Sequence, residues 1–344
     1  MKVLLISGSH PPEPCGVGDY TYRLWQSLLS EGVDVECLRH KRWRVHDIHT
    51  ALDAVDKAKA DIIHIQYPTV GYGRALGPQL LSCLRPCVVT IHEISQAHAL
   101  RKLSLYGFLG TAKMLIFTNT FERQAAMKLA PWIHRKSNII PIGTNILTSP
   151  SSIGNTSKTI GYFGLIRPHK GLEEIIALAK LALNVNRDFK ILIVGLEVHG
   201  QSDYYKMLRQ QSVGLPVEWR AGLQGQDLNA ALAECRIAYL PFPDGASERR
   251  SSLLTFLSRG TPVITTTGSQ VTEDLKSVVQ FAASPQEACS VAEKLFVDDG
   301  AWNDLHEKGL AYAKRISWNS IAQRHIQIYQ RLMLGAVANT PVRS

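Results

Sequence analysis

A polar loop between two apolar strands carries the residues with the clearest chemistry. The apolar run Ile237–Leu240 leads into the sequence DGASERRSSLL, which opens a helix. Backbone N–H groups at a helix start are unpaired and carry partial positive charge, so they bind anions. We place Arg249 and Arg250 in the first turn with Ser251 and Ser252, where they add forked donors for phosphate oxygens. The segment predicts a phosphate site, and a solvated basic loop is the alternative.

A second basic loop, GLIRPHKG, follows the expected strand at 159–163 and precedes another helix. Lys170 provides a point charge and Arg167 a forked donor, a combination that suits a diphosphate. A solvated basic loop is again the alternative.

A glycine loop, PPEPCGVGD, follows the first strand. Gly16 and Gly18 would let the backbone approach a ligand closely, and Asp19 could cap the next helix. The spacing is not G-x-G-x-x-G, so a dinucleotide fingerprint is absent. An ordinary glycine turn remains the alternative here.

His92 ends a buried strand in the sequence VVTIHEIS. A polar side chain at the carboxyl end of a strand in a parallel sheet tends to face the ligand, with a structural histidine as the alternative. His64 lies inside the strand of DIIHIQYP, so we expect it to pack in the core, and we expect Trp318 to be structural as well.

The chain alternates strands and helices throughout, which predicts parallel sheets with helices on both faces. In the first half we expect strands at 2–7, 33–38, 62–66, 87–91, 114–118 and 137–141, with helices at 20–31, 48–58, 77–84, 100–109 and 120–129. In the second half we expect strands at 159–163, 189–194, 217–220, 237–240 and 262–266, with helices at 172–183, 203–211, 226–233, around 274, at 287–296 and at 319–333. Residues 147–158 are rich in Ser, Thr, Pro and Gly and predict a linker.

Length and charge restrict the possible partners. A chain of 344 residues is long for one core, so we expect two domains. Its 38 Lys and Arg against 29 Asp and Glu give a net charge of +9, which favours anionic partners. Nucleic-acid binders usually interleave basic runs with exposed aromatics, whereas the one dense basic run here, at 39–44, stands alone. We therefore expect no nucleic acid.

The sequence motifs of several other protein classes are absent. The six cysteines complete no zinc pattern, so we expect reduced thiols and no metal. No Ser–His–Asp order, H-E-x-x-H or P-loop lysine occurs. Met1 leads straight into a strand and no apolar run reaches the ~18 residues that span a bilayer, which predicts a cytoplasmic protein without a signal peptide.

Taken in order, these segments resemble the retaining glycosyltransferases of family 4, which have the GT-B fold. The resemblance covers nearly the whole chain and is carried by PCGVGDYT, DIIHIQYP, VTIHE, IIPIGTNI, GLIRPHKG, DGASERRSSLL, SRGTPVITT and the closing helix. It implies two Rossmann-like domains with parallel sheets that face a central cleft. Residues 1–147 would form an acceptor domain, completed by a helix at about 318–335, and residues 158–317 a donor domain.

The resemblance also implies roles for individual residues. The catalytic set would be His92, Arg167 and Lys170. Asp19 and Tyr20 would contact the acceptor. The nucleotide-sugar donor would be bound by Gly16, Val17, Gly18, Arg249, Arg250, Ser251, Ser252, Leu253 and Thr255.

The chain departs from the family pattern at three positions. The family has two glutamates eight residues apart, whereas this chain has Ser247 and Thr255 there, with Glu248 one residue away from the first. A one-residue shift near a helix start points a side chain elsewhere. The usual arginine of the second-domain loop is Leu165. We interpret the cations at 249 and 250 as its replacement.

The expected activity is transfer of a sugar, with retention and without a metal or cofactor, from a UDP- or GDP-sugar to a saccharide, lipid-linked or other glycoconjugate acceptor in cell-surface polysaccharide synthesis. A non-catalytic GT-B subunit that binds a partner enzyme or nucleotide is the alternative, and a phosphorylase or epimerase is a third reading. The basic and apolar segment 101–117 could touch an anionic membrane on its inner face, or form buried helix and strand.

Overall fold

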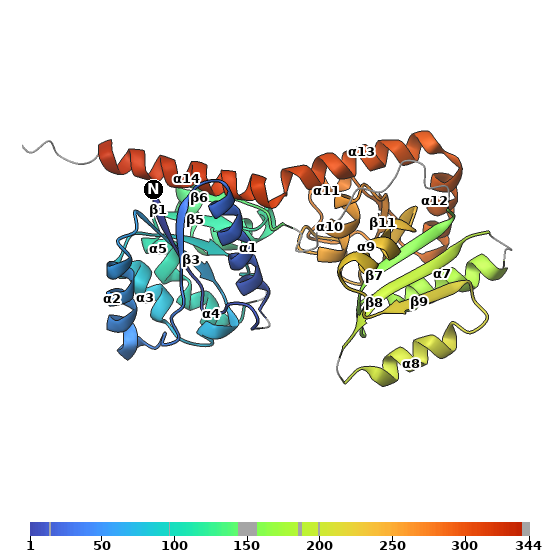
Figure 1. The fold of residues 1–344 in the computed structure, drawn as a ribbon, viewed down its shortest axis with the longest axis horizontal. Helices are drawn as coiled ribbons and strands as arrows, with labels where there is room; N and C mark the ends of the chain where they lie inside the picture. The colour runs from blue at the N-terminus through green and yellow to red at the C-terminus, as the bar shows by residue number, and fades with distance from the viewer. Residues whose placement is uncertain (14, 96, 144–156, 185–187, 199, 339–344) are drawn as a thin grey trace, which may run out of the picture. The chain divides into compact units, whose positions relative to one another are not determined.

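The computed structural model describes residues 1–338 except 14, 96, 144–156, 185–187 and 199. The chain divides into two compact units, which we call unit 1 (Met1–Asn145 with Ile316–Ser344) and unit 2 (Ile146–Arg315) (Figure 1). The segment that separates the two predicted domains, 147–158, lies almost wholly outside the described residues.

Unit 1 is built on a six-stranded parallel sheet in the order β2-β1-β3-β4-β5-β6. The strands are β1 (Lys2–Ile6), β2 (Asp34–Leu38), β3 (Ile62–Tyr67), β4 (Cys87–Ile91), β5 (Met114–Phe117) and β6 (Ser137–Ile139). The helices are α1 (Gly16–Ser30), α2 (Ile48–Ala58), α3 (Gly77–Leu84), α4 (Ala99–Ser104), α5 (Tyr106–Thr111), α6 (Thr120–Leu129) and α14 (Trp318–Ala338), with 3-10 turns η1 (Val45–Asp47), η2 (Val70–Tyr72) and η3 (Pro131–Lys136).

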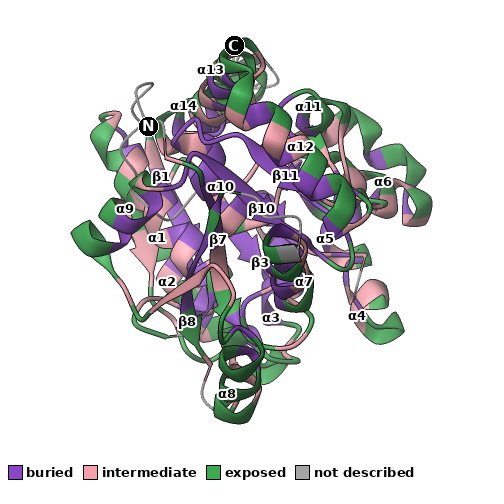
Figure 2. Ribbon diagram, turned by 90° about the vertical axis from the view of Figure 1, so that its right-hand side faces the viewer, coloured by how far each residue is buried: buried purple, intermediate pink, exposed green. Residues whose placement is uncertain are grey.

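Side chains alternate between the two faces of each strand, so unit 1 has a hydrophobic core on each face of its sheet. In β1, Leu4 and Ile6 join one core, and Val3 and Leu5 join the other. Because both faces are covered, the central strands are continuous apolar runs, drawn as buried in Figure 2. Helix α14 closes the second core against α1, where the rings of Tyr20 and Trp318 lie 5.1 Å apart.

Unit 2 has a second six-stranded parallel sheet, in the order β12-β11-β10-β7-β8-β9. Its strands are β7 (Thr159–Ile166), β8 (Lys190–Glu197), β9 (Val217–Ala221), β10 (Ile237–Leu240), β11 (Val263–Thr265) and β12 (Gln280–Phe281). Its helices are α7 (Leu172–Asn184), α8 (Ser202–Gln211), α9 (Gly225–Ala233), α10 (Ser251–Ser258), α11 (Glu273–Lys276), α12 (Pro285–Val297) and α13 (Asp299–Arg315).

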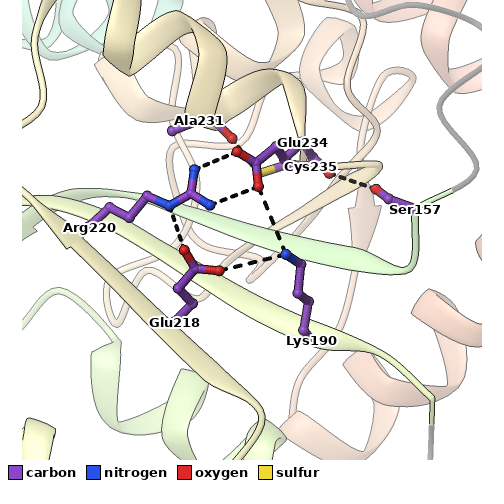
Figure 3. Close-up of polar contacts among 7 residues, drawn as sticks. All are labelled: Ser157, Lys190, Glu218, Arg220, Ala231, Glu234 and Cys235. Atoms are coloured by element: carbon purple, nitrogen blue, oxygen red, sulfur yellow. Dashed lines mark hydrogen bonds and ion pairs between the residues drawn. The ribbon is translucent and has the colours of Figure 1, made fainter.

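An ion-pair network ties the strands of one side of this sheet to α9 (Figure 3). The Arg220 guanidinium on β9 donates to the carboxylates of Glu218 and Glu234, and Lys190 on β8 lies 3.6 Å from Glu218 and 3.9 Å from Glu234. These side chains are partly exposed, so each pair adds little stability. The network instead fixes how β8, β9 and α9 sit together, and these elements border the cavity described below.

Helix α13 is the main element that the sequence patterns did not predict. It contains Gly300 and Gly309, which lower helix propensity, and its charged residues mask a narrow apolar stripe. Trp302 on that stripe is buried, donates its ring N–H to the Arg236 carbonyl at 2.8 Å and stacks on His306. Tertiary packing, not propensity, therefore specifies this helix.

Candidate functional site

Unit 2 contains a cavity of about 370 Å³ at the carboxyl ends of β7 and β8. We call it the basic cavity, because Lys170, Arg249 and Arg250 line it. Its other wall is apolar, formed by Leu196, Leu223, Leu228 and Phe242, with Gln224 beside them. The structure thus brings together the two basic loops that the sequence places 80 residues apart.

The loop after β7 holds its lysine through a constrained backbone. His169 has φ +61° and Gly171 φ +77°, both in the left-handed region. A Cβ at Gly171 would lie 1.9 Å from the Pro241 carbonyl oxygen, so only glycine fits there. Tyr162 on β7 donates its hydroxyl to the Lys170 carbonyl at 3.4 Å, which further fixes this turn.

Lys170 lies among other charges. Burial lowers the pKa of its ammonium group, the nearby Arg167 and Arg250 lower it further, and Asp244 opposes them. The two arginines lower the pKa of Lys170 because like charges repel each other. A bound anion would relieve that repulsion, which makes this cluster suited to phosphate.

The two arginines of the second loop are placed differently from the prediction. Helix α10 begins at Ser251, so Arg249 and Arg250 precede it and do not lie in its first turn. Arg249 donates to the Gln270 side chain at 3.0 Å. Arg250 is paired with Asp244, and its guanidinium stacks over the Phe242 ring at 4.7 Å. Both still line the basic cavity, although a carboxylate offsets part of the Arg250 charge.

The start of α10 supplies backbone donors to the same cavity. The N–H of Arg250 is bonded to Ser247, and that of Leu254 is bonded to the Arg250 carbonyl. Between them lie the N–H groups of Ser251, Ser252 and Leu253, which have no preceding helical carbonyl to bond. Ser251 and Ser252 line the cavity, whereas the Leu253 side chain is buried in the core behind it.

Thr255, at one family position, and Glu248, next to the other, do not line the cavity. Thr255, predicted to bind donor, is fully buried and donates its hydroxyl to the Ser251 carbonyl at 2.8 Å, so it is not accessible to a ribose. Glu248 accepts hydrogen bonds from Thr272 at 3.0 Å and Tyr312 at 3.1 Å. Glu248, which lies one residue after the family position at Ser247, therefore has a structural role. Leu165 does line the cavity, beside both arginines.

In unit 1 the glycine segment is helical. Gly16, Val17, Gly18 and Asp19 form the first turn of α1, whose N-cap is Cys15. The expected Asp19 cap is therefore wrong, because that residue lies inside the helix. A Cβ at Gly18 would come within 2.9 Å of the Ser9 carbonyl oxygen, whereas one at Gly16 would meet nothing within 4 Å. Gly18 thus serves close packing, and the open position at the helix start is Gly16.

His92 follows β4 and is only 8% exposed. Its Nε2 lies 3.0 Å from the Gln66 Oε1, an acceptor, so Nε2 carries the hydrogen and Nδ1 keeps its lone pair. Burial, with a contribution from His325, lowers the pKa of His92 to about 3. His92 is therefore a neutral group at physiological pH, and it can act as a hydrogen-bond acceptor but not as a cation.

A buried polar chain supports His92. The Gln66 amide lies 3.1 Å from His64 Nε2, and His64 Nδ1 lies 2.6 Å from the Tyr329 hydroxyl on α14. His64 is fully buried, which agrees with its predicted packing role. The sequence patterns missed Gln66, although its place at the carboxyl end of β3 was a usable signal.

Tyr20 packs against His92. It is 4% exposed, and its ring lies 4.7 Å from the His92 ring, edge to face. Asp19 is half-buried. The acceptor roles of Tyr20 and Asp19 stay predictions.

No protein-family model and no curated protein matches the chain. Solved structures match it over nearly its full length. HepE of Anabaena, in complex with UDP, is 16% identical with a TM-score of 0.70, over 96% of this chain and 100% of that one. Sucrose-phosphate synthase of Thermosynechococcus elongatus is 14% identical with a TM-score of 0.70, over 97% and 100%. A glycosyltransferase of Rickettsia africae is 12% identical with a TM-score of 0.73, over 97% and 98%.

The two six-stranded parallel sheets with flanking helices, matched along whole chains, define the GT-B fold. At these identities the likeness shows the fold alone, so the activity has to be argued from the site. Among the residues that the structure describes, no helix is long and apolar enough to cross a membrane.

Proposed function

We propose that the protein is a nucleotide-sugar-dependent glycosyltransferase whose unit 2 binds the donor. The observation that carries the proposal is the basic cavity, where Lys170, Arg249, Arg250 and the start of α10 meet an apolar wall. The cations and N–H groups suit a diphosphate, and the apolar wall suits a nucleoside. The structural neighbour HepE, which was solved with UDP and with UDP-glucose, supports this choice of ligand.

The groups that line the cavity would also accelerate the transfer reaction. When the sugar departs, negative charge develops on the diphosphate, and preorganised cations and N–H groups stabilise that charge. No general base for the acceptor is required if the leaving phosphate oxygen takes the proton. We accordingly propose a retaining, metal-independent transfer in which neutral His92 accepts a hydrogen bond from the donor sugar. Full activity in the presence of EDTA is the expected outcome.

The primary test is a thermal-shift screen across UDP-, GDP-, ADP- and dTDP-sugars. A nucleotide that binds only the folded state at 100 times its Kd adds about 2.7 kcal/mol of stability. We expect one nucleotide class to raise Tm and the Lys170→Ala variant to lose that rise. No shift with any of the four would contradict the proposal.

A second candidate function is a non-catalytic GT-B subunit that binds a nucleotide or a partner enzyme. The burial of Thr255 and the hydrogen bonds of Glu248 to Thr272 and Tyr312 favour it, because neither residue lines the basic cavity. Slow hydrolysis of the bound nucleotide-sugar by the purified protein, abolished in His92→Ala, would support the enzyme. Nucleotide binding without hydrolysis or transfer would support the subunit.

The proposed acceptor is a saccharide or lipid-linked glycoconjugate in polysaccharide synthesis, reached by a protein that contacts an anionic membrane. The exposed apolar side chains nearest to the cations of the segment 101–117 lie in and beside α4 (Figure 2). There Leu100 and Leu103 are 74% and 65% exposed beside Arg101 and Lys102, whereas Phe108 and β5 lie in the core. We expect the protein to co-sediment with anionic vesicles. The double variant Leu100→Ser, Leu103→Ser should co-sediment less. Binding that is indifferent to lipid charge would rule this contact out.

A further inference from the structure

The basic run RHKRWR at 39–44 is used by neither the basic cavity nor the His92 chain. It directly follows β2, the edge strand of the unit 1 sheet. Arg39, Lys41, Arg42 and Arg44 are all exposed. A run of four cations in six residues is unusual on a protein with only 19% charged residues.

This segment, which we call the basic loop, is held in one conformation by its tryptophan. Trp43 is 2% exposed and packs edge to face on Tyr72 with ring centroids 5.1 Å apart. Its ring N–H donates to the His40 carbonyl at 2.8 Å, and its own carbonyl accepts the Gly77 N–H at 2.9 Å. The four cations are thus presented from an anchored backbone, which reduces the entropy lost on binding.

The basic loop keeps its charge unneutralised. Within the part of the chain that the structure describes, none of its four cations has a carboxylate within 4 Å, and the ion pair that follows in the sequence joins His46 to Asp47 at 3.4 Å. Elsewhere in unit 1, Lys2 is paired with Glu36 and Arg85 with Asp56, but no other segment of the sequence gathers four cations within six residues. The cationic side chains of the loop therefore repel one another, and together they attract an external anion.

The position of the loop connects it to the proposed active edge. Ile6 of β1 pairs with Leu38 of β2, so the loop and the segment after β1 leave the same carboxyl edge of the sheet. His10 of that segment lies 3.6 Å from Cys37, and Arg39 is near enough to help lower the pKa of His10. A cavity of about 420 Å³ runs beside β2, and its charged lining comprises Lys2, Asp34, Glu36 and Arg39, of which Lys2 and Glu36 form an ion pair.

We propose that the basic loop recognises an acidic acceptor, a saccharide chain that carries carboxylate or phosphate groups. This inference rests on the proposed glycosyl transfer and names the substrate class for it. Several cations spread along a loop suit a chain with repeated charges better than a single anion. Nucleic acid is less suited, because the one aromatic side chain of the loop is buried and offers no stacking surface.

The test compares two triple variants with equal charge change by titration calorimetry. The loop variant is Lys41→Gln, Arg42→Gln and Arg44→Gln. The control variant is Lys57→Gln, Lys59→Gln and Lys113→Gln, three exposed cations of unit 1 near the amino ends of β3 and β5, the opposite edge of the sheet. The probes are trigalacturonate, a phosphorylated maltotriose and neutral maltotriose.

We expect wild type to bind an acidic probe more tightly than maltotriose, with affinity that falls as salt rises. The loop variant should bind it about tenfold more weakly, since three exposed pairs each contribute modestly, and the control variant should stay within about twofold. Equal affinity in the two variants, or no binding of either acidic probe, would overturn the inference. So would a larger loss for a single-stranded oligonucleotide or anionic vesicles than for the acidic saccharide.

Failure of this inference and failure of the proposed function are distinguishable. The thermal shift with nucleotide-sugars depends on unit 2 and should be the same in wild type and in both triple variants. A missing nucleotide shift in wild type would contradict the proposed function, while the calorimetry would still decide whether the loop binds acidic chains.

Discussion

Unit 1 should lose stability in acid because it buries three neutral histidines. Burial, as the main cause, lowers the pKa of His92 to about 3 and that of His325 to about 4, and it lowers that of His64 well below the ordinary value. The unfolded chain returns each to 6.5. Because these folded pKa values lie below the unfolded one, stability is complete above pH 6.5 and falls as the pH drops toward the folded values.

The magnitude follows from linkage. For a histidine with a pKa of 6.5 unfolded and about 3 or 4 folded, the move from pH 7 to pH 5 costs about 2 kcal/mol. His92 and His325 together therefore cost about 4 kcal/mol, and His64 acts in the same direction. A domain is stable by only about 5–15 kcal/mol, so the effect should be readily measured.

The most informative variant is His325→Leu. The His325 ring is fully buried and its Nε2 has no hydrogen-bond partner among the described residues, so leucine removes a titrating group and breaks only the bond from Nδ1 to the Ile321 carbonyl. The variant should lose about 2 kcal/mol less than wild type between pH 7 and pH 5. His49→Gln, which changes an exposed histidine on α2, is the control and should behave like wild type.

Hydrogen exchange of the amides in β3 and β4 is the suitable measurement, because two units need not unfold in one transition. Exchange is compared at both pH values after correction for the intrinsic rate. If wild type loses less than about 1 kcal/mol, or if His325→Leu loses as much as wild type, the assignment of acid lability to this buried cluster is wrong.

Three further predictions concern unit 2. Arg250→Ala should weaken nucleotide-sugar affinity about tenfold in calorimetry, since it removes a cation from the cavity wall, and unchanged affinity in both Arg249→Ala and Arg250→Ala would refute their role as replacement cations. Gly171→Ala should abolish donor binding and lower Tm, because its Cβ would collide with a carbonyl oxygen at 1.9 Å, and a variant with normal affinity would contradict that geometry. Glu248→Ala should cost unit 2 about 1–3 kcal/mol in urea unfolding, because the Tyr312 hydroxyl loses its acceptor, yet leave donor affinity within about twofold, whereas a large loss of donor affinity would contradict a purely structural role.

The fold could be predicted from sequence because its signal is local. Continuous apolar runs specify β4 and β10, and their predicted bounds agree with the structure at both ends. Helix starts were less well predicted. For α1 the pattern of apolar residues begins only at Tyr20, but the helix starts at Gly16, because packing of Gly18 against Ser9 stabilises an extra turn that propensity disfavours.

The site was predicted in part. The sequence did not predict which side chains contact each other. Residue types identified Lys170 and the arginines as anion-binding residues of two separate loops, and the structure places them around one cavity. Sequence could not indicate that Asp244 pairs with Arg250, since the loop must first turn back to bring them together. Nor could it indicate that Gln66 bonds to His92, because that contact crosses from β3 to β4 and depends on register.

The same distinction separates the two basic segments of the chain. By residue type, the loop before α10 and the basic loop at 39–44 predict the same thing, a surface that attracts anions. In the structure, Asp244 and Gln270 hold the two arginines of the first, beside the backbone donors of α10 and an apolar wall. The second keeps its cations exposed on an anchored loop, where no described residue places a carboxylate within 4 Å of them. The first arrangement suits one small ligand in a fixed pose, and the second suits a longer charged chain. The two segments therefore fit the two ligands of the proposed transferase, a nucleotide-sugar donor and an acidic saccharide acceptor.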